Sequence, residues 1–145
     1  VLPAPLGPIR PKISPRRTVI DTSAGEVEEE RLVLINPEIV HLDGQQLGEE
    51  GCLSIPGFRE DVRRAMTAKV RAFDVDGNAF EVTGEELLAR AMQHETDHLD
   101  GILFIDKLDT AARKAAMKEI RESAWFGQPA PQVRFSPHSI RPGLG

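Results

Sequence analysis

The sequence predicts an α+β fold, in which antiparallel or mixed strands pack around one central helix and a second helix follows near the C-terminus. Short apolar or alternating runs bounded by turn residues, which are typical of strands, fill the first half of the chain. Helical periodicity appears only later, and the most specific motif of the chain, His-Glu-x-x-His at residues 94–98, lies within it. Early strands and late helices favour the α+β class.

Composition narrows the class of protein. A chain of 145 residues is expected to form one domain over residues 1–145. A formal charge of −5 argues against a general nucleic-acid binder, and no apolar run approaches the roughly 20 residues of a membrane span. The N-terminus shows no secretory signal pattern, and a single cysteine cannot form an internal disulfide. We therefore expect a cytoplasmic protein with no membrane partner and no nucleic-acid specificity.

Both ends of the chain are rich in proline. Because proline fixes φ and lacks an amide donor, residues 1–17 are interpreted as an extended arm, with a disordered leader as the alternative. Residues 124–145 show little periodicity and are interpreted as an irregular tail, which could pack back through Trp125, Phe126 and Phe135.

Strands are expected in five places before the central helix. These are residues 18–21, 32–35, 39–42, 62–72 and 73–82. Asn36-Pro37 is expected to stop the second of them, because proline cannot donate to a strand ladder. Turns are expected at Asp43-Gly44 and at Asp76-Gly77-Asn78, the second of which would form a hairpin.

The two helices have recognisable ends. Thr83-Gly84-Glu85-Glu86 fits a capping box with Thr83 as the N-cap, and Gly101 suits the left-handed position just beyond the end of the central helix. Asp109 or Thr110 is expected to cap the second helix at about residues 111–123. Its core-facing residues would be Ala112, Ala116 and Ile120.

The motif in the central helix predicts a metal site. His94 and His98 lie four residues apart and so share one face of a helix, where two imidazoles can bind one divalent ion. Glu95 lies where a carboxylate can take a proton from a metal-bound water. The alternative is a chance spacing of two of the four histidines in the chain.

Cys52 is the third candidate ligand. It lies in Gly51-Cys52-Leu53-Ser54, within a glycine-flanked segment typical of a backbone that approaches a ligand closely. A thiolate and two imidazoles would leave a fourth metal position open for water, as catalytic sites require. The alternative is a buried structural cysteine.

Two stretches together resemble the peptide deformylase family. They are Glu-Gly-Cys-Leu-Ser at residues 50–54 and Gln-His-Glu-x-Asp-His at residues 93–98, the latter followed by Leu99-x-Gly101. The similarity runs from about Thr18 to Ser123. The resemblance implies a single catalytic domain that removes the N-formyl group from the N-terminal methionine of nascent peptides, through a metal-bound hydroxide.

The resemblance also implies a role for each matching residue. Cys52, His94 and His98 would hold the metal, which would be Fe²⁺ by resemblance, with Zn²⁺, Ni²⁺ or Co²⁺ as alternatives. Glu95 would act as general base and then general acid, and the backbone N–H of Leu53 would bind the oxyanion. Substrate-binding positions would be Gly48, Glu50, Gly51, Arg59, Leu87 and Ala91. The implied partners are formyl-methionyl nascent peptides, with the ribosome as a further candidate.

One motif of the family has no counterpart at the expected position. The family carries Gly-x-Gly-x-Ala-Ala-x-Gln before the first matching strand, and its glutamine supplies a second oxyanion donor. Residues 1–17 contain no glutamine, and Ala130-Pro131-Gln132-Val133 resembles the motif only at the wrong end of the chain. We therefore expect slow formyl hydrolysis, a wider cleft, and exposed core surface that the arm, the tail or a second subunit of a homodimer would cover.

Two alternatives to a deformylase remain at this point. One is a related metallohydrolase with an altered or broader range of ester or peptide substrates. The other is a truncated, non-catalytic remnant that binds metal or peptide, against which the presence of Glu95 argues.

Overall fold

The computed structural model describes residues 17–21 and 31–129 of the chain. The greater part of the predicted arm, the segment 22–30 and the tail from residue 130, including Phe135 and the Ala130–Val133 stretch, lie outside the described residues. Within them, the predicted combination of antiparallel strands, a central helix and a C-terminal helix is confirmed.

The described residues form six strands, which are followed by two α-helices with a 3₁₀ turn between them. The strands are β1 (Arg17–Asp21), β2 (Arg31–Asp43), β3 (Gln46–Cys52), β4 (Ile55–Arg64), β5 (Thr67–Phe73) and β6 (Ala79–Glu85). The helices are α1 (Glu86–Leu99), a 3₁₀ turn (Phe104–Lys107) and α2 (Thr110–Glu122). All strand pairs are antiparallel, in a four-stranded sheet of order β1-β2-β5-β6 and a separate hairpin of β3 and β4.

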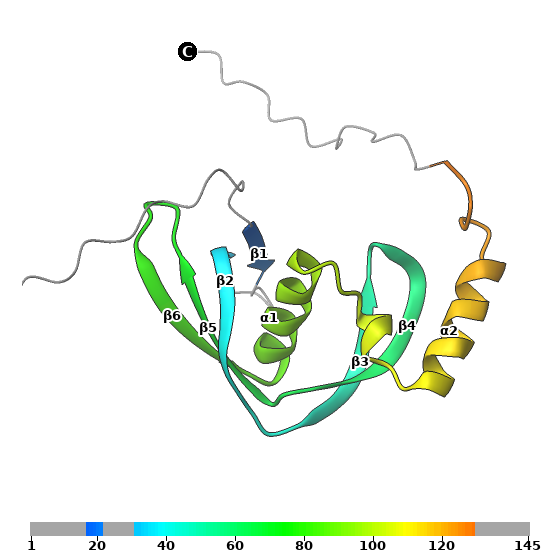
Figure 1. Cartoon of the computed structure of the whole chain (residues 1–145), viewed down its shortest axis with the longest axis horizontal. Coiled ribbons are helices and arrows are strands. Elements are labelled where there is room, and N and C mark those ends of the chain that lie inside the picture. The colour runs from blue at the N-terminus through cyan, green and yellow to red at the C-terminus, as the bar shows by residue number, and fades with distance from the viewer. Residues whose placement is uncertain (1–16, 22–30, 130–145) are drawn as a thin grey trace, which may run out of the picture.

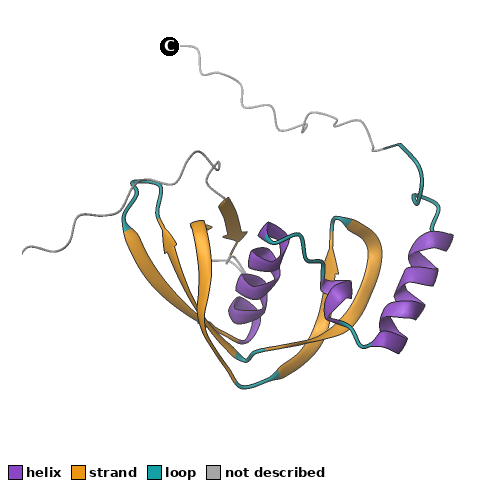
Figure 2. Cartoon of the chain, in the orientation of Figure 1, coloured by secondary structure: helices purple, strands orange, loops and turns teal. Residues whose placement is uncertain are grey.

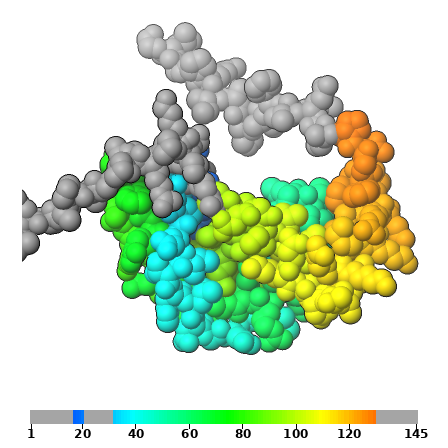
Figure 3. All heavy atoms as spheres, in the orientation of Figure 1, coloured from blue at the N-terminus to red at the C-terminus, as the bar shows by residue number. Residues whose placement is uncertain are grey.

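Helix α1 lies between these two β layers. Figure 1 shows it with the four-stranded sheet on one side and the β3–β4 hairpin on the other, while α2 flanks the outer side of the hairpin. Figure 2 shows the same order as a helix between two strand layers, followed by the second helix. On the face drawn in Figure 3, atoms of α1 fill the space between β2 and the segment that leads to α2. The central helix therefore contacts both layers.

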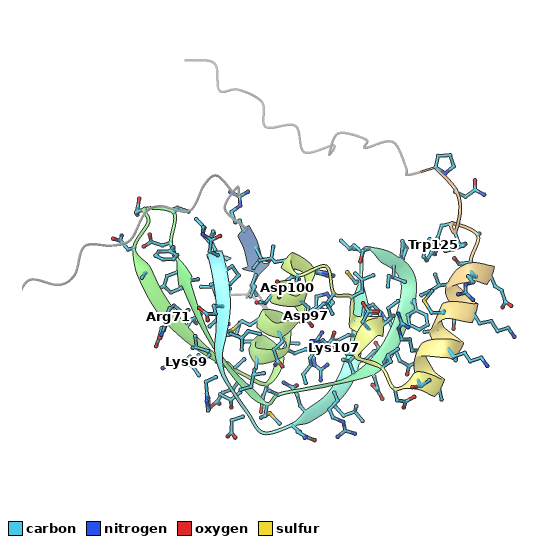
Figure 4. The ribbon with its side chains drawn as sticks, viewed as in Figure 1. Lys69, Arg71, Asp97, Asp100, Lys107 and Trp125 are labelled. Atoms are coloured by element: carbon cyan, nitrogen blue, oxygen red, sulfur yellow. The ribbon has the colours of Figure 1, made fainter. Side chains whose placement is uncertain are left out.

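One hydrophobic cluster joins α1 to the four-stranded sheet. Its buried residues are Ile20, Leu34, Ala68, Val70, Ala72, Ala89 and Met92. They alternate along the strands with outward-facing residues such as Lys69 and Arg71, because successive side chains of a strand point to opposite faces (Figure 4). This packing fixes one side of α1 against the sheet.

A second cluster joins the hairpin to the C-terminal part of the chain. It contains Ile55, Phe58, Val62, Phe104, Ile105, Ala116 and Ile120. Trp125 packs against it and donates a hydrogen bond from Nε1 to the Pro56 carbonyl at 3.0 Å. The prediction that the tail packs back through Trp125 therefore holds, whereas Phe126 is exposed.

The prediction that Asn36-Pro37 ends a strand was wrong. Strand β2 continues through both residues to Asp43. Its register with β5 shifts between Ile35 and Glu38, and Asn36 adopts a left-handed φ of 50°. A bulge absorbs the missing proline amide, because pairing resumes on the far side of it.

The predicted capping box at Thr83 was also wrong. Strand β6 remains paired with β5 as far as Glu85, and Glu85 is the N-cap without a side-chain hydrogen bond. Gly84 permits this abrupt change, because a Cβ there would meet Leu88 Cγ at 2.7 Å and Met92 Sδ at 2.8 Å. Strand pairing and close packing set the start of α1, whereas its end agrees with the prediction, with Gly101 at a φ of 74°.

Two further predictions agree with the structure. The β5–β6 hairpin turns at residues 74–78, as expected, although residues 62–64 belong to β4, which pairs with β3 and was not predicted. Asp109 caps α2 by accepting a hydrogen bond from the Ala112 amide at 2.8 Å. Among the residues described, no helix combines the length and apolar character needed to cross a bilayer.

Candidate metal centre

His94 and His98 project from the same face of α1. Their Nε2 atoms are 3.0 Å apart, and the two rings meet edge to face with centroids 4.6 Å apart. This follows from the helix itself, since residues four apart lie one above the other. Both side chains are half-buried, at the side of α1 that faces the β3–β4 hairpin.

The hairpin brings Cys52 to these histidines. Cys52 is the last residue of β3 and precedes the tight Leu53-Ser54 turn into β4. Its Sγ lies 3.2 Å from His98 Nε2 and 2.9 Å from Ser54 Oγ. One donor atom from each of Cys52, His94 and His98 lies within 4.8 Å of the others. The hairpin thus supplies a third donor from 46 residues away in the sequence.

The surroundings of Cys52 favour the thiolate, which is the form that binds a cation. Burial raises the pKa of the Cys52 thiol, but hydrogen bonds from Ser54 and the nearby His94 outweigh this and lower the pKa below its ordinary value of 9.0. A lower pKa favours the thiolate, which is the form that ligates metals. The three donor atoms would stand about 3.4–3.6 Å apart around a tetrahedral ion with ordinary bond lengths. Two of the three separations, 3.0 and 3.2 Å, are close to this and all three lie within 4.8 Å, so the donor set fits a single ion.

Glu50 contacts His94 on the ring nitrogen that faces away from Cys52 and His98. Its buried carboxylate is 3.0 Å from His94 Nδ1, so that Nε2 of the same ring faces Cys52 and His98. A carboxylate on the far nitrogen fixes the tautomer and the plane of a ligating imidazole. The hydrogen bond with Glu50 raises the pKa of His94, against the opposing effect of burial.

Two buried arginines donate hydrogen bonds to the carboxylate of Glu50. Arg64 Nε and Arg90 Nη1 each donate to Glu50 Oε1 at 2.8 Å. Burial raises the pKa of Glu50, but hydrogen bonds from His94 and Arg64 outweigh it and lower the pKa to about 2. Arg90 also donates to the carbonyls of Gly48 and Val62. The arginines therefore tie β3, β4 and α1 together behind the donor cluster.

Arg64 extends this polar network to Asp97, whose other oxygen is 3.5 Å from Lys107 Nζ. Figure 4 shows Asp97 and Lys107 between α1 and the 3₁₀ turn that follows it. Arg64, Arg90 and Asp97 were not predicted as parts of the site. The signal available in the sequence was a charged residue inside an apolar pattern, most clearly Arg90 between two alanines.

Glu95 follows the first candidate ligand, His94, on α1. Its side chain is half-buried, and its Oε2 accepts a hydrogen bond from Thr18 Oγ1 of β1 at 3.3 Å. Thr18 was also missed in the sequence, because a threonine in a strand has no distinguishing pattern.

The other predicted site residues fall into two groups. A pocket of about 350 Å³ beside Cys52 is lined by Gly51, Leu53, Pro56, Gly57, Phe58 and Arg59. The structure does not bring the other four predicted substrate-binding residues into this pocket, and one of them, Glu50, contacts His94 instead. Gly48 lies against Arg90, Leu87 is exposed on the first turn of α1, and Ala91 packs on the sheet cluster. A larger hollow of about 570 Å³, lined by residues such as His41 and Lys69, contains none of the candidate ligands.

An α+β scaffold that brings one thiol and two imidazoles together, with a glutamate directly after one of the histidines on the helix, is the arrangement expected of a mononuclear metallohydrolase. Comparison with known proteins makes the assignment specific. Residues 11–114 match the family model described as polypeptide deformylase, and the chain belongs to this family.

Individual relatives agree. A peptide deformylase of Acidobacterium capsulatum is 53% identical over 116 residues, which cover 80% of this chain and 68% of that protein. One from Acidothermus cellulolyticus is 49% identical over 108 residues, covering 74% of this chain and 59% of that protein. The crystal structure of a peptide deformylase from Legionella pneumophila superposes with a TM-score of 0.64 at 44% identity, covering 72% of this chain and 60% of that one. The chain thus spans roughly three fifths to two thirds of the length of these relatives.

Proposed function

We propose that this chain is a metal-dependent amide hydrolase that removes the N-formyl group from the N-terminal methionine of nascent peptides. The observation that carries the proposal is the convergence of Cys52, His94 and His98 within 4.8 Å. Family membership supports the same activity. The alternatives, an esterase or peptidase and a non-catalytic remnant, become outcomes of the test below.

Cys52, His94 and His98 would hold the ion. Cys52 comes from the β3–β4 hairpin, and the two histidines come from α1. Thiolate and imidazole donors suit Fe²⁺, Zn²⁺, Ni²⁺ and Co²⁺, and Fe²⁺ is the choice that the family resemblance favours. A bound ion would act as a Lewis acid on the formyl carbonyl and would acidify a water molecule.

Glu95 would carry the proton transfers. It would accept a proton from the water that attacks the formyl carbon, and it would return that proton to the amine when the carbon–nitrogen bond breaks. The products are formate and a peptide with a free N-terminal amine. Its place beside His94 on α1 supports this role, because a general base must lie within reach of the attacking water.

The Leu53-Ser54 turn would serve the substrate. The backbone N–H of Leu53 would donate to the oxyanion that develops on the formyl oxygen. Gly51 and Arg59 share the 350 Å³ pocket with Cys52, which supports a role for them in binding the peptide. We retain Gly48, Leu87 and Ala91 as predicted contacts of the methionine side chain. For Glu50 we propose orientation of His94, because its carboxylate is already bonded to His94, Arg64 and Arg90.

The proposed substrate indicates the partners and the cellular location of the protein. Formylated nascent chains are the proposed partners, and the ribosome that presents them is a further candidate, which together imply action in the cytoplasm. We propose that residues 1–145 form a single catalytic domain, with a homodimer as the candidate assembly.

The test is hydrolysis of a formyl-methionyl tripeptide by protein prepared without oxygen and loaded with Fe²⁺ or Ni²⁺. We expect turnover with one ion per chain, and a loss of about 100- to 10,000-fold in kcat for Glu95→Ala, the range for a positioned acid–base group. A protein that binds one ion but cleaves only esters or unformylated peptides would identify the altered substrate range. Bound metal with no hydrolysis of any of these substrates would identify the remnant.

A further inference from the structure

Thr18 and Glu95 meet although 77 residues separate them in the sequence. Thr18 is the second residue of β1, and its side chain faces α1 together with that of Ile20, whereas Val19 between them points outward. The Thr18 hydroxyl donates to Glu95 Oε2 at 3.3 Å. Within residues 17–21 and 31–129, it is the one side chain that donates a hydrogen bond to Glu95.

The surroundings of Thr18 are apolar. It is 8% exposed, and its cross-strand neighbour Leu34 and its strand neighbour Ile20 belong to the buried cluster under α1. A valine would occupy almost the same volume without burying a hydroxyl, and burial of a hydroxyl in apolar surroundings has a free-energy cost unless it is hydrogen-bonded. Packing alone therefore gives no reason for the hydroxyl, whose partner is the Glu95 carboxylate.

The hydrogen bond between Thr18 and Glu95 is suited to a carboxylate that transfers protons. A glutamate side chain has three rotatable bonds, so a half-exposed carboxylate samples several positions. Threonine is branched at Cβ and restricted at χ1, so it presents its hydroxyl from a fixed place on the sheet. A hydrogen bond to Oε2 restrains the carboxylate, and no side chain of the described residues bonds to Oε1, the oxygen that would exchange a proton with water.

We propose that Thr18 is a positioning residue, which orients the Glu95 carboxylate toward the water that attacks the formyl carbon. This inference rests on the proposed function, because it assigns Thr18 an effect only through Glu95. It predicts an effect on the rate of turnover and none on substrate binding or on metal content.

The test compares Thr18→Val, which removes the hydroxyl, with Thr18→Ser, which keeps it. In Fe²⁺- or Ni²⁺-loaded protein we expect Thr18→Val to lower kcat on the order of tenfold, the size of one lost hydrogen bond to a charged group, with unchanged KM and one ion per chain. Thr18→Ser is expected to stay within about twofold of the original kcat, because it retains the hydroxyl. Thr83→Val on β6, an exposed threonine outside the cluster, is the matched control.

Thermal unfolding supplies a readout independent of turnover. If Thr18 acts through Glu95, replacing it by valine changes the melting temperature differently in the original protein and in a Glu95→Ala background, since only the former loses the hydrogen bond. Equal shifts in the two backgrounds would overturn the inference. So would a Thr18→Val variant with the original kcat, or one in which kcat and melting temperature fall together without rescue by serine.

The two proposals fail differently. If the loaded protein shows no Glu95-dependent hydrolysis, the proposed function fails, and the role of Thr18 fails with it. If hydrolysis depends on Glu95 but is indifferent to Thr18→Val, the positioning role alone is refuted.

Discussion

The Nδ1 atom of His94 lies 3.0 Å from Oε2 of Glu50, a residue 44 positions earlier in the chain and almost completely buried. This contact sets the direction of the His94 ring and links the candidate metal centre to the interior of the protein. The same carboxylate accepts from Arg64 and Arg90. Stability and the geometry of the site therefore depend on one side chain.

Replacing Glu50 by glutamine should lower both the stability of the protein and the metal affinity of the site. The change removes the buried carboxylate that Arg64 and Arg90 share, although Arg64 still pairs with Asp97, and breaking such a buried pair typically costs about 3–5 kcal/mol of unfolding free energy. It also removes the restraint on His94, for which we expect metal affinity to fall by about 10- to 100-fold. Denaturant unfolding and metal titration measure the two effects.

Glu49→Gln is the control for this variant. Glu49 is the preceding residue, but its side chain is exposed, and within the described part of the chain its ion pair is with the exposed Arg59. We expect little change in stability or metal affinity. Equal effects of the two substitutions would contradict the role assigned to Glu50.

Acid should destabilise the metal-free protein through the same carboxylate. The folded pKa of Glu50, about 2, lies below its ordinary value of 4.5. The stabilisation is therefore fully present above about pH 4.5, and it is lost as the pH falls toward 2. We expect the difference in unfolding free energy between the original protein and Glu50→Gln to shrink across this window. A difference that stays constant from pH 6 to pH 3 would show that Glu50 is not stabilised in its ionised form.

Metal binding should stabilise the fold through Cys52. An ion that binds only the folded state adds about 2.7 kcal/mol at a concentration 100 times its Kd. Melting temperatures with Ni²⁺ and after chelation measure this, and Cys52→Ala is expected to abolish the difference. His41→Ala, a change to an exposed histidine on β2, should preserve it. A stabilisation that survives Cys52→Ala would exclude Cys52 as a ligand.

Thr96→Val should make the protein more stable. The Thr96 side chain is buried on α1, and its hydroxyl has no hydrogen-bond partner within the described part of the chain. An unpaired buried hydroxyl costs about 1–3 kcal/mol, and valine has nearly the same shape, so we expect a gain of about 1 kcal/mol. The exposed Thr83→Val should give less than about 0.5 kcal/mol in the same urea unfolding measurement. A loss of stability at position 96 would mean that the hydroxyl is bonded after all.

Part of this molecule is determined locally by its sequence. His94 and His98 share a face because any helix places residues four apart together, and Asp109 caps α2 through its own neighbouring amides. The β5–β6 turn forms at Asp76-Gly77-Asn78 because Gly77 accepts a positive φ, here 84°. Each of these depends on a few adjacent residues, so the pattern alone was sufficient.

Tertiary structure decided the ends of β2 and α1 and the contacts between distant residues of the site. Asn36-Pro37 did not end β2, and Thr83 did not start α1, because pairing with β5 outweighed the local signals in both strands. Packing of the hairpin against α1 brought Cys52 to His98, and the same packing gathered Arg64 and Arg90 around Glu50. Thr18 reached Glu95 through the sheet. These contacts join segments tens of residues apart, and their free energy comes from burial and charge pairing that exist only once the layers have assembled.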